Sequence, residues 1–102
     1  MKYKWVGWKK DAGSDKVWGV IMNSPPSPDS WDIPGRYCVF WGRRGAKLQT
    51  KIHLVWEWSI DDLIQKKHNK GYQLVAPELL NTIYPGFEED LKKTAMWSVL
   101  SS

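Results

Sequence analysis

The chain has 102 residues, of which 42% are hydrophobic and 25% charged, a size and composition typical of a single globular domain. Its only cysteine, Cys38, excludes an intramolecular disulfide and a cysteine-only zinc site, so we expect a reducing, cytoplasmic environment. No apolar run approaches about 20 residues and the amino terminus lacks a signal-type apolar stretch, so we expect a soluble protein without a membrane span.

The net charge of +4 is concentrated in the middle of the chain. Residues 33–77 hold eight Lys and Arg against three acids, whereas residues 78–102 hold two Lys against four acids. A basic centre of this kind attracts polyanions through its long-range field and through counterion release. A basic surface that only aids solubility is the alternative interpretation.

The amino-terminal part of the chain predicts two strands and a loop. Tyr3 and Trp5 alternate with lysines, which is the pattern of a half-buried strand. After a turn over residues 11–15, residues 16–23 are nearly all apolar and predict a central strand covered on both faces. The proline-rich segment 24–30 lacks backbone donors for a ladder and predicts an exposed loop.

Residues 36–43 predict a third strand, and residues 47–58 predict its hairpin partner across a turn at 44–46. Alternation places two sets of side chains on opposite faces, Tyr37, Val39, Trp41 and Arg43 on one and Cys38 and Phe40 on the other. The hairpin gathers basic residues at and just after its tip, where a turn exposes them: Arg43, Arg44, Lys47 and Lys51.

A helix is predicted from about Ile60, because Ser59 and Asp62 have the spacing of a capping box. The residues of its apolar face follow at helical spacing: Ile60, Leu63, Ile64 and the aliphatic stem of Lys67. Gly71 is expected to end this helix as a left-handed cap, and residues 72–75 to add a short strand.

The carboxyl-terminal part predicts two further helical segments. Pro77 indicates the start of a short helix that ends after Tyr84, at Pro85 and Gly86. A terminal helix is predicted from about Phe87, since acids precede lysines in the order that a helix dipole favours. Its later apolar residues point to all sides, which indicates a tail packed in a groove or against another copy.

Residue patterns of catalysis and metal binding are scarce. His53 and His68 do not have the spacing of metal ligands, and Asp61 and Asp62 are placed to cap the predicted helix rather than to catalyse. Cys38 lies in the middle of a strand, as a small buried residue does. The sequence also lacks a phosphate-binding loop and a nucleophile elbow. We therefore expect a protein that is not an enzyme and uses no metal or cofactor.

Eight tryptophans exceed the needs of a small core, because each indole is bulky and its N–H requires an acceptor. Four are assigned to packing: Trp5, Trp18, Trp56 and Trp97. Trp41 differs because Gly42 and the arginines Arg43 and Arg44 follow it directly. A ring that stacks on a base or sugar, beside guanidinium groups that bind phosphate, suits nucleic-acid strands and ends. The alternative is a core tryptophan flanked by solvated arginines.

Residues 37–45, Tyr-Cys-Val-Phe-Trp-Gly-Arg-Arg-Gly, resemble the signature strand of the WGR domain family. Residues 62–72 and 84–87 are similar to the family's helix and to its later tyrosine-proline segment, so the resemblance covers about half of the chain. It implies a small antiparallel sheet packed by a helix, as in the module attached to DNA-dependent poly(ADP-ribose) polymerases and in bacterial proteins. By position, it implies that Trp41 stacks on a terminal nucleotide near a DNA break and that Arg43 contacts DNA or a neighbouring domain.

We therefore predict one α+β domain over residues 1–102, with a mostly antiparallel sheet packed by one main helix in residues 2–87 and a helical tail over residues 87–102. The leading hypothesis is a non-catalytic module that binds nucleic acid, DNA in preference to RNA, at ends or nicks, through phosphate contacts and stacking without base readout. The candidate binding residues are Trp41, Gly42, Arg43, Arg44, Lys47, Lys51, Lys66 and Lys70. The alternative is a protein-protein interaction or homodimerisation module that uses exposed Trp and Arg. We do not expect the protein to associate with a membrane or to act on a small-molecule substrate.

Overall fold

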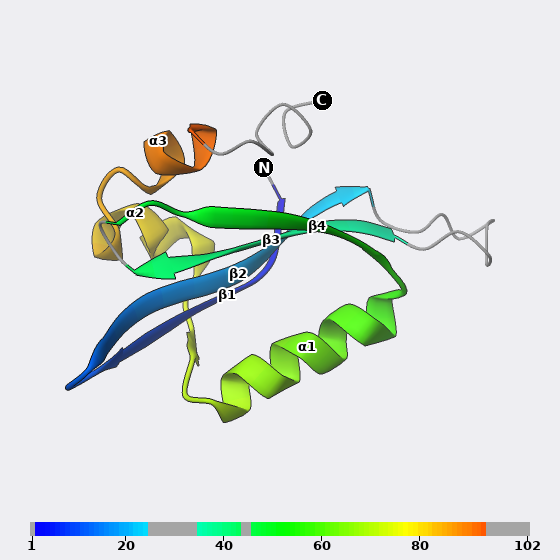
Figure 1. Cartoon of the computed structure of the whole chain (residues 1–102), viewed down its shortest axis with the longest axis horizontal. Coiled ribbons are helices and arrows are strands. Elements are labelled where there is room, and N and C mark those ends of the chain that lie inside the picture. Colours follow the sequence, from blue (N-terminus) through cyan, green and yellow to red (C-terminus); the bar gives the residue numbers. More distant parts are fainter. Residues whose placement is uncertain (1, 25–34, 44–45, 94–102) are drawn as a thin grey trace.

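The computed structural model describes residues 2–24, 35–43 and 46–93 of the chain. They form a five-stranded antiparallel sheet with helices on both sides (Figure 1). In chain order the elements are β1 (Lys2–Asp11), β2 (Ser14–Ser24), β3 (Gly35–Arg43), β4 (Gln49–Val55), α1 (Glu57–Asn69), β5 (Gln73–Leu74), the 3-10 turn η1 (Pro77–Leu79), α2 (Leu80–Ile83) and α3 (Phe87–Lys92). The predicted α+β class is confirmed.

The strand order β4-β3-β2-β1-β5 makes β2 the middle strand, as its apolar sequence predicts. Val17 and Ile21 of this strand are buried on one face, and Trp18 and Val20 on the other. The predicted alternation of side chains along β3 is also confirmed. Cys38 and Phe40 belong to a first core cluster, on the face of Val17 and Ile21. The other set, Tyr37, Val39 and Trp41, lies in a second core cluster on the face of Trp18 and Val20.

One prediction for β1 is wrong. A bulge between Tyr3 and Trp5 shifts the register, so the two rings lie on opposite faces instead of sharing one. Tyr3 packs edge-on against Phe40, with the ring centroids 6.3 Å apart, and Trp5 lies 5.9 Å from Trp18 on the other face. The bulge also directs Lys4 toward α1, where its Nζ lies 3.0 Å from Glu57 Oε1.

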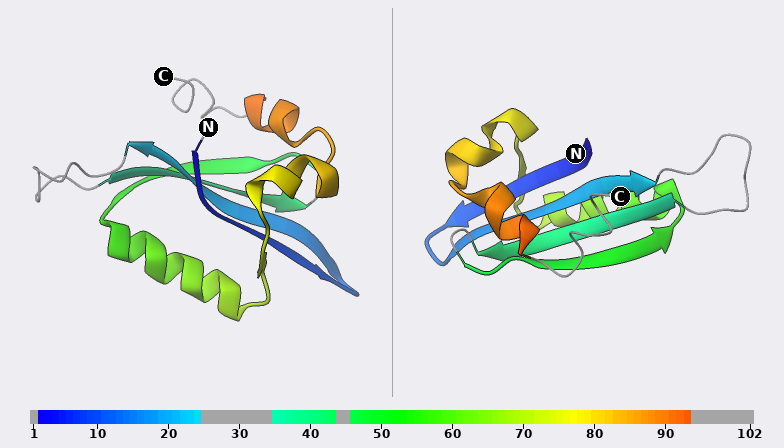
Figure 2. Two further views of the ribbon diagram at one scale, coloured as in Figure 1. Left: turned by 180° about the vertical axis from the view of Figure 1, so that it is seen from behind. Right: turned by 90° about the horizontal axis from the view of Figure 1, so that it is seen from above.

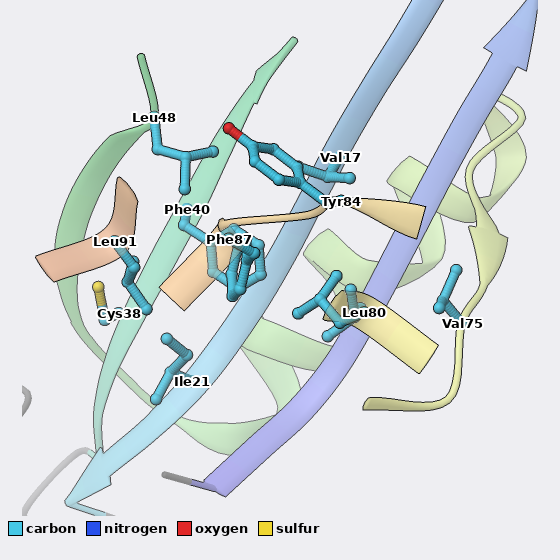
Figure 3. Close-up of a cluster of buried hydrophobic side chains, with 11 residues drawn as sticks. Val17, Ile21, Cys38, Phe40, Leu48, Val75, Leu80, Tyr84, Phe87 and Leu91 are labelled. Carbon is cyan, nitrogen blue, oxygen red and sulfur yellow. The ribbon is translucent and has the colours of Figure 1, made fainter. Parts of the chain in front are cut away.

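The helices η1, α2 and α3 cover one side of the sheet, which we call the sealed face (Figures 1 and 2). Phe87 and Leu91 of α3 are fully buried there, and the Phe87 ring lies 5.0 Å from Phe40 (Figure 3). The hydroxyl of Tyr84 lies 3.0 Å from the carbonyl oxygen of Ala46 and 2.8 Å from Asp90 Oδ2. This hydroxyl therefore ties the start of the segment leading into β4 to α3.

Helix α1 covers the other side of the sheet, which we call the groove face (Figure 2). It begins at Glu57, and Trp56 occupies the N-cap position without a side-chain hydrogen bond, so the predicted capping box is wrong. Asp61 and Asp62 therefore do not cap the helix. They form ion pairs instead, Asp61 with Lys4 at 3.3 Å and Asp62 with Lys66 at 3.2 Å.

The carboxyl-terminal end of α1 is defined by Gly71, as predicted. This glycine has a φ of 106°, a conformation that L side chains rarely adopt. Its N–H donates to the carbonyl of His68, and the N–H of Tyr72 donates to the carbonyl of Lys67, which together form a Schellman motif. The chain then returns as β5, which pairs with β1.

Gly7 of β1 allows the segment after α1 to approach the sheet closely. A Cβ at this position would collide with the ring of Trp5 and would lie 2.9 Å from Cβ of Tyr72. The predicted helical segments after Pro77 and from Phe87 are confirmed. The proline-rich loop and the apolar tail, including Trp97, lie outside the described residues. No helix within the described ranges is long and apolar enough to cross a membrane.

Candidate nucleic-acid interface

A groove of about 320 Å³ opens on the groove face, between α1 and the strands β3 and β4. Its lining comes from five parts of the fold: Trp18 of β2, Val39 and Trp41 of β3, Lys51 and His53 of β4, Leu63 and Lys67 of α1, and Tyr72 after the helix. The lining thus contains three large aromatic rings, and it carries one lysine on the β4 side and one on the α1 side, which we call the two banks of the groove. Most of these side chains are far apart in sequence.

The register of the sheet brings together the lining residues that come from the strands. Trp41 lies opposite Trp18 across the β2–β3 ladder, and Val39 lies opposite Lys51 across the β3–β4 ladder. His53 follows two residues after Lys51 and therefore points to the same face. Sheet pairing, rather than proximity in the chain, thus builds the strand side of the groove.

The aromatic residues of the groove differ in what they offer a ligand. Trp18 is only 3% exposed and packs against Trp5, so its main role is in the core. Tyr72 is also buried, and burial raises the pKa of its hydroxyl. Trp41 is half-buried, packed against the α1 core on one side and open to the groove on another. Trp41 is therefore the ring with surface left for stacking.

Lys67 supplies the cation on the helix bank. Its Nζ lies 5.7 Å from the ring centroid of Trp18 and 5.9 Å from that of Tyr72, within the range of cation–π contacts. Burial, and then the charges of Lys70 and Lys16, lowers the pKa of Lys67. The charged form of Lys67 is therefore destabilised in the folded protein by desolvation and by repulsion from the other two lysines. An anion bound in the groove would offset both effects.

Lys51 supplies the cation on the strand bank. Its charge acts on the neighbouring imidazole, since burial and then Lys51 lower the pKa of His53. Within the described residues no ion pair compensates Lys16, Lys51, Lys67 or Lys70. The carboxylates of α1 that form ion pairs do so with other lysines, as Asp62 does with Lys66. The groove is thus a positively charged site without a compensating carboxylate.

The structure brings together only part of the site predicted from sequence. Trp41 and Lys51 both line the groove. Lys70 is the C-cap residue of α1 and is close enough to Lys67 to lower its pKa. Arg43 is exposed at the end of β3, opposite Lys16, and does not line the groove.

The other predicted residues lie elsewhere. Lys47 lines a separate hollow of about 210 Å³ together with Asp90 and Lys93. Lys66 is exposed and paired with Asp62. Gly42 lets the backbone at Lys47 pack closely against the end of β3, since a Cβ on Gly42 would lie 3.3 Å from the carbonyl oxygen of Lys47. Arg44 lies outside the described residues.

Several residues in or near the groove were not among the residues predicted from sequence. Lys67 was assigned only for its aliphatic stem, although a lysine on the apolar face of a helix is the pattern of a cation placed over a core. Lys16 alternates with Trp18 on β2, so it lies on the same face, but its distance from the basic hairpin in sequence hid the relation. His53 follows Lys51 at the spacing of strand alternation, so the predicted strand already placed both on one face, whereas no sequence signal indicated that Tyr72 would join them.

The thiol of Cys38 is buried in the core. Burial raises the pKa of the Cys38 thiol to about 11, so it stays protonated and unreactive near neutral pH. Within the same ranges, no group of three or more His, Cys, Asp or Glu is placed to hold a metal ion. The chain matches no protein-family model, no curated protein and no solved structure.

Proposed function

We propose that the chain is a non-catalytic module that binds nucleic acid in this groove, with DNA ends or nicks as the favoured targets. The observation that carries the proposal is the half-buried ring of Trp41, which lines one groove together with Lys51 and Lys67 and with no carboxylate. The lysines would contact phosphates while the indole stacks on a base or sugar. The resemblance of residues 37–45 to a WGR strand supports the same role for Trp41.

The arrangement favours binding without recognition of base sequence. Readout of bases in the major groove of DNA needs a helix or a two-stranded ribbon whose polar side chains reach base edges. The groove of this protein instead presents rings, aliphatic side chains and ammonium groups, which contact features that all nucleotides share. We therefore expect affinity to depend strongly on salt and weakly on sequence.

Fluorescence anisotropy with labelled nicked and blunt DNA duplexes tests this proposal. The Trp41→Ala variant is expected to lose about 1–3 kcal/mol of binding free energy, the range for one stacked base. Trp58→Ala is the matched control, because that ring is 70% exposed on α1, about half a helical turn from the buried Ile60. Parent affinity should also fall steeply between about 50 and 200 mM salt. Equal affinity of Trp41→Ala and the parent would contradict the proposal.

A protein-protein contact is the second candidate, and the exposure of Trp58 favours it. A tryptophan on the outer side of a helix offers an anchor of the kind found at interfaces. Leu54, 66% exposed near the end of β4, adds apolar surface. Sedimentation velocity at several protein concentrations tests self-association, which Trp58→Ala should reduce. Binding to such an interface should respond little to salt, in contrast to phosphate binding.

A further inference from the structure

We infer that the groove holds one unpaired nucleotide at a time, so that among DNA ends those with unpaired residues are preferred to fully paired ones. The inference rests on the proposed nucleic-acid function and names the form of nucleic acid that the groove takes. Three features of the groove carry it: its size, the position of its open ring, and the placement of its cations.

The size of the groove limits what can enter. Its volume of about 320 Å³ is near the lower end of the range for sites that bind small molecules, about 300–1,000 Å³. Helix α1 bounds it on one side and the edge strand β4 on the other, so a ligand must fit between two banks. One base with its sugar is a ligand of that class. A base within a duplex is covered on both faces by its neighbours and cannot enter without leaving the stack.

The position of Trp41 favours an inserted base over a contact at the surface. Its half-buried ring is part of the groove lining and not of an exposed ridge, so a base must enter between the banks to stack on it. Val39 and Leu63 line the same space with aliphatic side chains, which suit the faces of a base. His53 adds a ring nitrogen that can donate or accept a hydrogen bond at the sugar, a feature that all nucleotides share.

The cations lie where the phosphates on either side of that nucleotide would pass. Lys51 is on the β4 bank, whereas Lys67 is on the α1 bank with Lys70 close to it. A strand crossing the groove from β4 to α1 would therefore place one phosphate near each bank. A single cluster of lysines on one side would suit a backbone running along the surface, but cations on both banks suit a strand that crosses.

Competition between three DNA probes of one sequence tests the inference: a single strand, a duplex with a short overhang and a blunt duplex. The single strand and the overhang are expected to bind at least about tenfold more tightly than the blunt duplex, because no base must be unpaired. A 2-aminopurine in the overhang should lose fluorescence on binding to the parent, since stacking quenches it, and should keep it with Trp41→Ala.

Matched variants locate the contacts. Lys51→Gln and Lys67→Gln should weaken binding of the single strand several-fold. Lys47→Gln and Lys66→Gln are the controls, because they remove the same charge outside the groove and should leave affinity near that of the parent. Thermal unfolding followed by circular dichroism verifies that each variant is folded.

The possible outcomes separate this inference from the broader proposal. Equal affinity for the three probes, with Trp41→Ala still defective, would overturn the single-nucleotide inference and leave nucleic-acid binding intact. Tighter binding of the blunt duplex would do the same. Absence of binding to every probe would overturn both. Equal losses for the groove variants and their controls would show that charge alone acts, which would also overturn the inference.

Discussion

The two faces of the sheet differ in how completely helices cover them. On the sealed face, Phe87 and Leu91 of α3 close over Phe40, and all three side chains are fully buried. On the groove face, Ile60 is the only buried residue of α1, and the later residues of the same helical stripe are half-buried. The sealed face thus encloses its core fully, whereas the groove face has a core of its own and also keeps an opening lined by aromatic and charged side chains.

The contrast follows from the residues that each helix presents. α3 places large apolar side chains against the sheet and exposes most of its charged ones, while Asp90 is half-buried and accepts a hydrogen bond from the Tyr84 hydroxyl. α1 is fixed near its start by Ile60 and by the ion pairs of Lys4, but it presents Lys67 toward the sheet one turn after Leu63. A charged group cannot be enclosed without a partner, so the cover remains open at that end.

The largest expected effect is on the sealed face. Phe87→Ala should lower the free energy of unfolding by about 3–5 kcal/mol, because the ring is fully buried against Tyr3, Phe40 and Tyr84. Urea denaturation followed by tryptophan fluorescence measures this loss. Trp58→Ala should stay within about 0.5 kcal/mol of the parent. A loss below about 1 kcal/mol for Phe87→Ala would contradict the close packing assigned to this face.

A smaller effect is expected at the end of the helix that covers the groove. Gly71→Ala should cost about 1–2 kcal/mol, the penalty for an L residue in the left-handed region, since Lys9 leaves ordinary van der Waals space for the added Cβ. Gly13→Ala is the matched control, because nothing lies within 4 Å of its added Cβ. Chemical denaturation of both variants measures the difference, and equal costs would contradict the assigned helix cap.

On the groove face, removal of a charge should affect binding without loss of stability. In the folded protein, burial and then Lys70 and Lys16 lower the pKa of Lys67, so the charged form is less favourable there than in the unfolded chain. Lys67→Met keeps an apolar stem and should leave the free energy of unfolding unchanged or raised. It should also reduce the salt dependence of nucleic-acid binding by about one phosphate contact. Destabilisation by more than about 1 kcal/mol would show that the lysine serves mainly in packing.

The smallest effect is a dependence of stability on pH. Burial and then Lys51 lower the pKa of His53 below its ordinary value of 6.5. The unfolded chain therefore binds a proton first, and this residue's contribution to stability, complete above pH 6.5, is lost as the pH falls toward the lowered pKa. Urea titrations between about pH 7.5 and pH 5 should show a shallower decline for His53→Gln. Lys51→Gln should reduce part of the decline, and an unchanged slope in both variants would contradict the assignment.

Local patterns were sufficient wherever neighbouring residues decide the structure. The apolar run 16–23 predicted the central strand, and the glycine after the basic end of α1 predicted its cap. Predictions from local patterns were wrong where a contact between residues far apart in the chain competes with the local signal. A bulge in β1 separates Tyr3 from Trp5 and brings Lys4 to the acids of α1, and α1 starts earlier than the capping-box spacing of Ser59 indicated.

The candidate site shows the same division. Trp41 and Lys51 were predicted from one hairpin, because strand alternation is a local property, whereas Lys67 and Tyr72 join them only through helix packing. Lys16 comes near Lys67, outside the groove lining, only through the fold. The sequence by itself determined the α+β class, the middle strand and the basic, aromatic character of the hairpin. The tertiary structure alone decided which lysines share the groove with Trp41, since pairing across the sheet and the position of α1 set the distances between residues that the chain keeps far apart.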